Sequence, residues 1–346
     1  MKKNKIAVVG AGFFGCLVAL ELSKKNGSEV YLYEENKDIL LGASGKNQNR
    51  AHEGYHYPRS QKTVKQVQES LADFKDFFPK NIFGNSKNFY CISKINSKTN
   101  TRKYKNFLNK NKLFYKEVKS FKFASDLICS TFLVKEKILN IHKTKEFLKK
   151  KINKSSNIKL MLNKKYNKKM YKIYDKIIFC TYDKNNENLS SKYREQQRYE
   201  FVEKIIVKMP IEFKNISIVV LDGDFTCIDP LVGTNFHLLS DVKHSKLKIW
   251  RKYIKKTNNK FNKIIKFQNL KKNNFNKFIS HSSQYLPILK KAKYIKSFYV
   301  IRAIKENLKT DSRLSTIKKI DNKTYSVFSA KWISCVSVAK KISKII

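Results

Sequence analysis

The chain has 346 residues, of which 41% are hydrophobic and 13% aromatic. It can therefore bury a large core over about two domains, and it is not a disordered protein. No apolar run approaches the roughly 20 residues that a membrane-spanning helix needs. The formal net charge is +47, but 66 of the 74 basic residues are Lys, spread along the whole chain. This disfavours a role in reading nucleic acid, because such proteins usually use Arg for bidentate contacts.

The high charge still leaves room for a partner that is an acidic electron acceptor or an anionic surface. The six cysteines lie far apart and have no CxxC or metal-like spacing, so we expect a reducing, cytoplasmic setting. Histidines and acidic residues show no ligand spacing either, and we expect no metal. Composition indicates no oligomeric state.

The first predicted element is a strand at residues 6–9, which runs into GAGFFG and then into a helix. In this pattern Gly10 lets the chain turn sharply, and Gly12 leaves the backbone open to a pyrophosphate. Gly15 lets the helix pack close to the strand, and the start of the helix directs N–H groups at the phosphates. The predicted contacts with a dinucleotide are Gly10, Ala11, Gly12, Phe14 and Gly15.

A second predicted strand, at residues 30–33, delivers Glu34, which follows Gly15 by 19 residues. A carboxylate at this point can accept hydrogen bonds from ribose hydroxyls, and the absence of an Arg just after it favours NAD or FAD over NADP. A secretory signal is the alternative for this segment, but three glycines interrupt its apolar core and no small-residue cleavage site follows. Strand, glycines, helix, strand and acid in this order predict a Rossmann-like fold.

Further along, a small-residue turn at 40–45 and a polar, aromatic segment at 46–60 precede a series of alternating elements. Their periodicity and turn residues set the expected types. Helices are predicted at residues 61–78, 103–113, 138–152, 246–289 and 333–346. Strands are predicted at residues 88–95, 158–163, 174–181, 201–209, 216–221, 225–228, 237–242, 297–304 and 326–329. The order predicts an α/β fold into which an antiparallel sheet is inserted, with the strand at 177–181 and the chain end returning to the first sheet.

The segment GASGKNQNRAHEGYHYPR, residues 42–59, together with the N-terminal pattern, resembles the FAD-dependent oxidoreductases of the D-amino-acid oxidase superfamily. Weaker similarity lies at residues 174–181, 221–230, 311–313 and 327–331. The resemblance implies FAD as the cofactor. It also implies a Rossmann-like FAD-binding domain (residues 1–87, 138–185 and 296–346) with an inserted antiparallel-sheet α+β substrate-binding domain (residues 88–137 and 186–295).

The resemblance further implies cofactor contacts from segments that follow the first unit. They are Ala43, Ser44, Lys46, Asn47, Arg50, Thr181, Arg313, Ser329 and Lys331, with Arg50 and His52 nearest the flavin ring. In the family a Gly commonly precedes the last Lys, whereas this chain has Ala330. Lys331 also fits on chemical grounds, because reduction adds negative charge at the flavin N1–C2=O region.

Enzymes of this kind take a hydride from a carbon that bears an amine or a hydroxyl group, and Arg usually holds a substrate carboxylate. Arg302 and Arg59 are the first choices for that role. His52 is the candidate base, and Tyr57 is a candidate for the pocket wall. Three of the candidate site residues have a structural alternative. His52 could form a hydrogen bond with Glu53, Arg59 could form a surface ion pair, and Lys331 could be a solvated surface residue.

The expected function is that of an FAD-dependent oxidase or dehydrogenase. It would move a hydride from a small-molecule substrate, which is an amino acid, a secondary amine or a 2-hydroxy acid. One alternative is a flavin enzyme that acts on a modified nucleoside in RNA, which the +47 charge would suit. The other is a non-catalytic dinucleotide-binding protein, since fold alone does not settle function.

Overall fold

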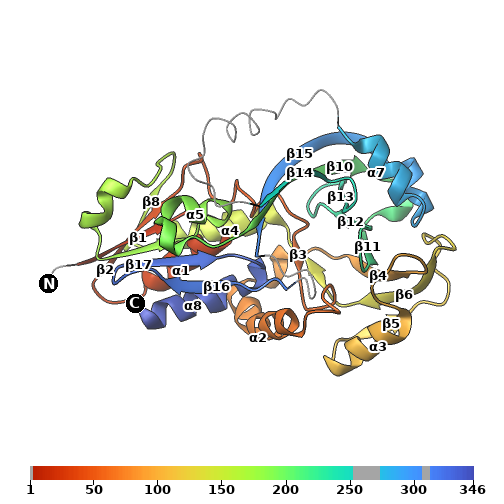
Figure 1. Cartoon of the computed structure of the whole chain (residues 1–346), viewed down its shortest axis with the longest axis horizontal. Coiled ribbons are helices and arrows are strands. Elements are labelled where there is room, and N and C mark those ends of the chain that lie inside the picture. Colours follow the sequence, from red (N-terminus) through yellow and green to blue (C-terminus); the bar gives the residue numbers. More distant parts are fainter. Residues whose placement is uncertain (1–2, 252–272, 306–311) are drawn as a thin grey trace.

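The computed structural model describes residues 3–251, 273–305 and 312–346. Two β-sheets lie at opposite ends of an elongated molecule, and both chain ends lie beside the first sheet (Figure 1). The fold class predicted from the sequence, a Rossmann-like domain combined with a largely antiparallel sheet, is confirmed.

The first sheet has six strands in the order β16, β17, β9, β1, β2, β8. All neighbours are parallel except the β16–β17 hairpin. The strands are β16 (Thr316–Lys319), β17 (Thr324–Phe328), β9 (Lys176–Phe179), β1 (Asn4–Val9), β2 (Ser28–Tyr33) and β8 (Ile158–Met161). As predicted, β9 rejoins this sheet beside β1, and the chain end returns to it through β17.

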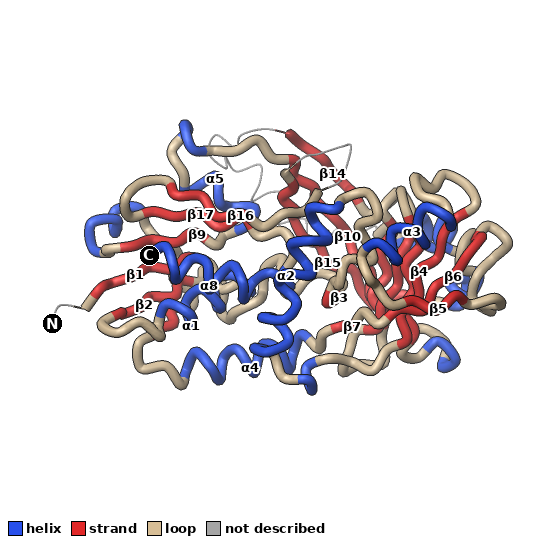
Figure 2. The backbone as a smooth tube through the Cα atoms, turned by 90° about the horizontal axis from the view of Figure 1, so that it is seen from below, coloured by secondary structure: helices blue, strands red, loops and turns tan. Residues whose placement is uncertain are grey.

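Helices cover one face of this sheet. Ile6 and Val8 of β1 point into a core with α1 (Phe13–Leu22), whereas Ala7 and Val9 pack with tyrosines on the opposite face. Figure 2 shows α8 (Cys335–Ile345) alongside α1, with α4 (Ile141–Asn153) on the other side of α1. Burial on both faces explains why β1 is continuously apolar from Ile6 to Val9. The remaining elements at this end are α2 (Gln61–Phe77), α5 (Asn185–Asn188) and the 3₁₀ turns η1 (Lys80–Ile82), η2 (Lys168–Ile173), η3 (Tyr182–Lys184), η4 (Ser191–Tyr193) and η8 (Trp332–Ser334).

The second sheet has nine strands in the order β14, β10, β13, β12, β11, β4, β6, β5, with β15 paired along β10. Every pair is antiparallel except β11 with β4. The strands are β4 (Lys87–Ser93), β5 (Tyr115–Glu117), β6 (Ile128–Val134), β10 (Arg198–Lys208), β11 (Ile216–Leu221), β12 (Thr226–Pro230), β13 (His237–Asp241), β14 (Lys246–Arg251) and β15 (Lys293–Ile304). Around it lie α3 (Thr101–Lys110), α7 (Phe275–Ser282), η5 (Ile211–Phe213) and η7 (Pro287–Lys291).

A short ladder joins the two halves. Strand β3 (Arg50–Ala51) pairs with β7 (Lys137–Ile138). Next to it the chain at residues 82–84 meets the chain at 138–140. The Gly84 N–H donates to the Ile138 carbonyl at 2.8 Å, and the Asn140 N–H donates to the Ile82 carbonyl at 2.7 Å. The two ends of the β4–β6 segment are therefore bonded to each other.

Most predicted elements are found within a few residues of their expected bounds, but two differences have physical causes. Strands β5, β6 and β16 were not predicted; β5 and β16 have only three and four residues, and β6 pairs with β4, which lies about 40 residues earlier. The helix predicted at 246–289 is wrong at its start, where the Lys-rich segment pairs with β10 as β14. Residues 252–272 lie outside the described residues, and the helix at 275–282 is present.

The predicted domain boundaries stay a prediction, with one difference at β15. Residues 296–304 were assigned to the FAD-binding part, yet β15 pairs with β10 along the second sheet. Among the described residues, no helix is both long and apolar enough to cross a membrane.

Candidate cofactor and substrate site

A cavity of about 600 Å³ runs from the carboxyl ends of β1 and β2 to the inner face of the second sheet. Most residues predicted for the site line it, although they come from segments spread over the whole chain. They are Gly10, Gly12, Phe14, Glu34, Ala43, Ser44, Lys46, Asn47, Arg50, His52, Thr181, Arg302, Arg313, Ser329 and Lys331. Ala11, Gly15, Tyr57 and Arg59 do not line it.

The three glycines of the first turn are needed for close packing. Gly10 has φ +96°, and a Cβ there would lie 2.8 Å from the Cys180 carbonyl oxygen. A Cβ on Gly15 would lie only 1.7 Å from the Gly10 carbonyl oxygen, so the helix can follow the strand this closely only with glycine. A Cβ on Gly12 would lie 2.8 Å from Ser44 Oγ. These are the roles that the sequence pattern predicts for a strand–turn–helix cradle.

Glu34 ends β2 beside this turn. Its Oε2 accepts a hydrogen bond from the Ala11 N–H at 2.8 Å, and its Oε1 accepts one from the Asn36 N–H at 2.9 Å. The carboxylate is thus buried and held at the carboxyl edge of the parallel strands, which is where such sheets bind ligands.

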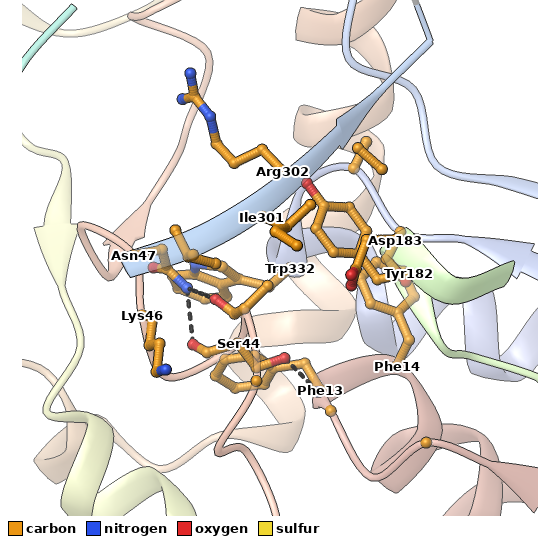
Figure 3. Close-up of a pocket in the computed structure, with 18 of the residues that line it drawn as sticks. Phe13, Phe14, Ser44, Lys46, Asn47, Tyr182, Asp183, Ile301, Arg302 and Trp332 are labelled. Atoms are coloured by element: carbon orange, nitrogen blue, oxygen red, sulfur yellow. Dashed lines mark hydrogen bonds between the residues drawn. The ribbon is translucent and has the colours of Figure 1, made fainter. Parts of the chain in front are cut away.

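The 42–47 loop is attached to the start of α1. Ser44 Oγ accepts a hydrogen bond from the Phe13 N–H at 3.1 Å, and Asn47 Nδ2 donates to the carbonyls of Ser44 at 2.7 Å and Ala43 at 3.1 Å. Figure 3 shows this group below β15. Lys46 Nζ lies 3.5 Å from the Tyr299 carbonyl oxygen, and burial lowers the pKa of Lys46.

The last cavity segments come from the chain between β9 and α8. Thr181 donates to Asn185 Oδ1 from its N–H at 2.8 Å and from its hydroxyl at 2.7 Å. The Lys331 Nζ lies 4.8 Å from the centre of the Tyr57 ring. Tyr57 is therefore placed behind Lys331 and not in the cavity wall. The Ala330 N–H donates to Ser315 Oγ at 3.1 Å.

These residues fit a dinucleotide such as FAD. The turn is glycine-lined, and Gly12 as N-cap gives α1 no side-chain cap of its own. A carboxylate stands at the end of β2, where a ribose is expected. Lys331 lines the same cavity, and a flavin ring would need such a positive group beside it.

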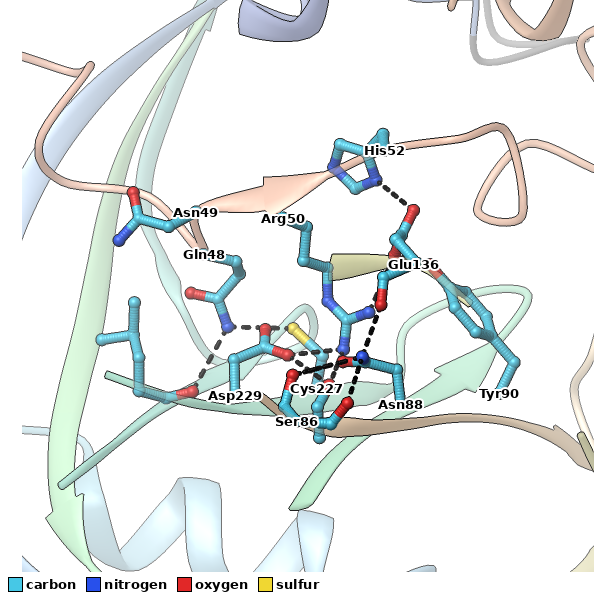
Figure 4. Close-up of polar contacts among 12 residues, drawn as sticks. Gln48, Asn49, Arg50, His52, Ser86, Asn88, Tyr90, Glu136, Cys227 and Asp229 are labelled. Atoms are coloured by element: carbon cyan, nitrogen blue, oxygen red, sulfur yellow. Dashed lines mark hydrogen bonds and ion pairs between the residues drawn. The ribbon is translucent and has the colours of Figure 1, made fainter. Parts of the chain in front are cut away.

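Arg50 borders the cavity, but it also takes part in a buried group of ion pairs that the sequence did not predict. Its guanidinium is turned into a buried polar group in which Nη1 lies 2.9 Å from Glu136 Oε2 and Nη2 contacts Asp229 and Ser217 (Figure 4). Tyr90 donates its hydroxyl to the same Glu136 oxygen at 2.7 Å. Nη1 and Nη2 of Arg50 are therefore bound to protein acceptors, although Arg50 also borders the cavity.

His52 is oriented by Glu136 and not by Glu53. His52 Nδ1 lies 3.3 Å from Glu136 Oε1, whereas Glu53 pairs with Lys75. Burial, and then the charge of Lys331, lower the pKa of His52 to about 4. The imidazole is therefore neutral at physiological pH and can accept a proton.

The two candidate arginines are separated by the structure. Arg302, on β15, lines the cavity and pairs with Glu200. Arg59 pairs with Asp222, with Nε 2.6 Å from Oδ2, outside the cavity lining. Figure 3 shows Arg302 projecting from β15 away from Ser44 and Phe13.

Sequence reasoning missed Lys204, a buried lysine of β10 in the cavity wall. Its Nζ donates to Gln48 Oε1 at 3.0 Å, and burial lowers the pKa of Lys204 to about 8. Asp183 was missed too, and burial raises the pKa of this carboxyl to about 7. The position of Lys204 beside the apolar run at residues 205–207 of β10 is the signal that could have found it, but 65 other lysines obscure it.

The fold and the cavity define a nucleotide-binding protein with a separate sheet that closes the ligand site. Comparison with known proteins narrows this class. Residues 5–101 match the family model described as FAD dependent oxidoreductase. This match confirms, over that segment, the resemblance found in the sequence.

The FAD-dependent monooxygenase kojA of Aspergillus flavus is 36% identical over 99 residues, which are 29% of this chain and 23% of that protein. The chain thus matches about a quarter of the length of this curated relative. The matched family and this relative are both FAD-dependent, in agreement with the cofactor predicted from the sequence.

Solved structures resemble the chain over its whole length. L-proline dehydrogenase from P. horikoshii gives a TM-score of 0.69 at 12% identity, covering 99% of this chain and 93% of that one. L-α-glycerophosphate oxidase from Mycoplasma pneumoniae with FAD bound gives 0.68 at 14% identity, covering 100% and 95%. At such low identity these likenesses establish the fold.

Proposed function

We propose that the chain is an FAD-dependent oxidoreductase that oxidises a small anionic substrate at a carbon bearing an amine or a hydroxyl group. The observation that carries the proposal is the continuity of the cavity. One end meets the glycine turn and Glu34, and the other end is walled by Arg302 and Lys204 of the second sheet. The family match over residues 5–101 supports the choice of FAD.

Bound FAD supplies a hydride acceptor. The residues that would hold it are the start of α1 and Gly12 at the pyrophosphate, Glu34 at the ribose, and the 43–47 loop at the middle of the cofactor. Lys331 would supply positive charge at the ring. Ala11 and Gly15 support the turn from outside the cavity.

Substrate binding is assigned to the second sheet. Arg302 and Lys204 would hold an anionic group there, which favours an amino acid, a secondary amine with a carboxylate, or a 2-hydroxy acid as substrate. Neutral His52 can accept the proton from the amine or hydroxyl group, with Glu136 fixing its ring. Glycerophosphate, named in one solved relative, is an anion of a different kind and belongs in the same screen.

The visible absorption spectrum of the purified protein is the first test. Release of the chromophore by acid should yield FAD, and anaerobic bleaching against amino acids, hydroxy acids and phosphorylated polyols should identify the substrate. A colourless protein that does not take up added FAD would refute the proposal. Bound FAD that no donor bleaches would favour the non-catalytic alternative.

A nucleoside in RNA is the second candidate substrate, and the +47 charge is the observation that favours it. RNA binding through phosphates falls steeply with salt. RNA that bleaches the flavin and binds with such a salt dependence would replace the small-molecule substrate. Binding of an acidic electron acceptor or an anionic surface would also weaken with salt, but neither would bleach the flavin. We further propose a cytoplasmic location, since all six cysteines are free thiols.

A further inference from the structure

Three potential metal ligands meet outside the cavity, at the end of β13. Asp241 is the last residue of that strand, His244 lies in the turn that follows, and His281 comes from α7. His244 Nδ1 lies 3.1 Å from Asp241 Oδ1, and His281 Nδ1 lies 2.5 Å from Asp241 Oδ2. One carboxylate therefore faces two imidazole nitrogens, one at each oxygen.

The cluster lies on the other face of the second sheet from the cavity. Ser240 and Val242 line the cavity, whereas Asp241 between them does not. Successive side chains of a strand point to opposite faces, so the Asp241 carboxylate points away from the cavity. Any ion bound here is separate from the proposed flavin site.

The geometry suits a small divalent ion. The three ligand atoms lie within 4.8 Å of one another. Zinc bonds to His nitrogen and to carboxylate oxygen are about 2.0–2.2 Å long, so tetrahedral ligand atoms stand roughly 3.3–3.5 Å apart. Small rotations of the two imidazole rings would open their 3.1 and 2.5 Å distances from the Asp241 carboxylate to this value. Two imidazoles and one carboxylate are a donor set typical of Zn²⁺.

Outer contacts already hold the ligands in place. Asp241 Oδ1 accepts the His244 N–H at 2.8 Å, and Oδ2 accepts the Ser282 hydroxyl at 3.1 Å. Asn274 Nδ2 lies 3.3 Å from the His244 carbonyl oxygen. Such contacts orient metal ligands and strengthen binding. The Asp241 carboxylate is fully buried, while about a quarter of the His244 side chain is exposed, which gives an ion a way in.

We propose that Asp241, His244 and His281 form a binding site for a divalent transition metal of the Zn²⁺ class. The Nδ1 atom of each ring and one Asp241 oxygen would hold the ion, so each imidazole would carry its proton on Nε2. Water completes the coordination. The ion joins β13 to α7 and so fixes the strand whose other face walls the cavity.

Calorimetric titration of the untagged, full-length, flavin-loaded protein with ZnSO₄ tests the proposal. One equivalent of Zn²⁺ should bind, and X-ray absorption at the zinc edge should show two imidazole ligands. His244→Gln and His281→Gln should each weaken this binding on the order of tenfold or more. His142→Gln is the matched control, because His142 is exposed on α4, and it should bind like the wild type.

Absence of a one-equivalent site in the wild type would overturn the proposal. So would variants that bind zinc as well as the wild type, or a His142→Gln variant that loses binding equally. The flavin spectrum and circular dichroism of each variant establish that it is folded. If His281→Gln does not fold, the partly exposed His244 still provides the test through His244→Gln. Because zinc binding is read directly, the outcome is independent of the proposed enzymatic activity.

Discussion

The guanidinium of Arg50 and the carboxylate of Glu136 form an ion pair, with 2.9 Å between Nη1 and Oε2. Both side chains are almost completely buried. Asp229 completes the group from β12. The pair connects β3 to the segment just before β7, at the junction between the two sheets. Burial by itself would raise the pKa of Glu136, but His52 and Arg50 lower it well below the usual range.

Breaking this group should be costly. Arg50→Met leaves two buried carboxylates without their cation, and we expect a loss of about 3–5 kcal/mol in the free energy of unfolding. Arg59→Met, which breaks a partly exposed pair with Asp222, should cost about 1 kcal/mol or less. Equilibrium unfolding in urea measures both. Equal losses would contradict the structural role assigned to Arg50.

Gly12→Ala should weaken FAD binding. The added Cβ would lie 2.8 Å from Ser44 Oγ, so the 42–47 loop or the helix start must move away from the cofactor position. We expect a loss of about tenfold to hundredfold in affinity, equivalent to roughly 1.4–2.8 kcal/mol, measured by flavin fluorescence titration. Gly27→Asn is the control, because Gly27 has open space around it and Asn tolerates its positive φ. A similar loss in both variants would indicate a general loss of fold.

Arg302 and Arg59 should differ in their effect on catalysis. A charge-assisted hydrogen bond contributes about 1.5–3 kcal/mol, so Arg302→Gln should lower kcat/KM about tenfold to hundredfold for the donor that bleaches the flavin. Arg59→Gln should change kcat/KM little, because Arg59 lies outside the cavity lining. Steady-state kinetics with both variants decides between them. The reverse ranking would restore Arg59 as the substrate-binding residue.

Lys204 should make stability depend on alkaline pH. Its pKa falls to about 8 on folding, from the usual 10.5, so the folded protein disfavours its charged form. Below pH 8 the charged lysine lowers the free energy of unfolding by its full amount, roughly 3 kcal/mol. This loss disappears as the pH rises toward 10.5. Lys204→Met should therefore stabilise the protein at pH 7, and by less than half as much at pH 9.5.

The control for this experiment is Lys208→Met, at the exposed end of the same strand. It should change the free energy of unfolding little at either pH. A Lys204→Met gain that is the same at both pH values would show that packing, and not the charge of the lysine, causes it.

The N-terminal βαβ unit was predictable because its strand, turn and helix are encoded by adjacent residues. The ion pairs of Arg50 could not be predicted, because Glu136 lies 86 residues away and Asp229 lies 179 residues away. The β5 and β16 strands were missed because they have only three and four residues, too few to show a periodic pattern. Asp241 and His281, 40 residues apart, show no ligand spacing in the sequence, yet β13 and α7 bring them into contact.

The hydrogen bonds between residues 82–84 and 138–140 close the β4–β6 segment into a loop with its two ends joined. Loop-closure entropy rises only slowly with length, so such a segment can be lengthened, shortened or exchanged at little cost to the nucleotide-binding sheet. Changes in the β4–β6 segment could therefore adapt the substrate side of the cavity to a new substrate, while the nucleotide-binding sheet stays unchanged.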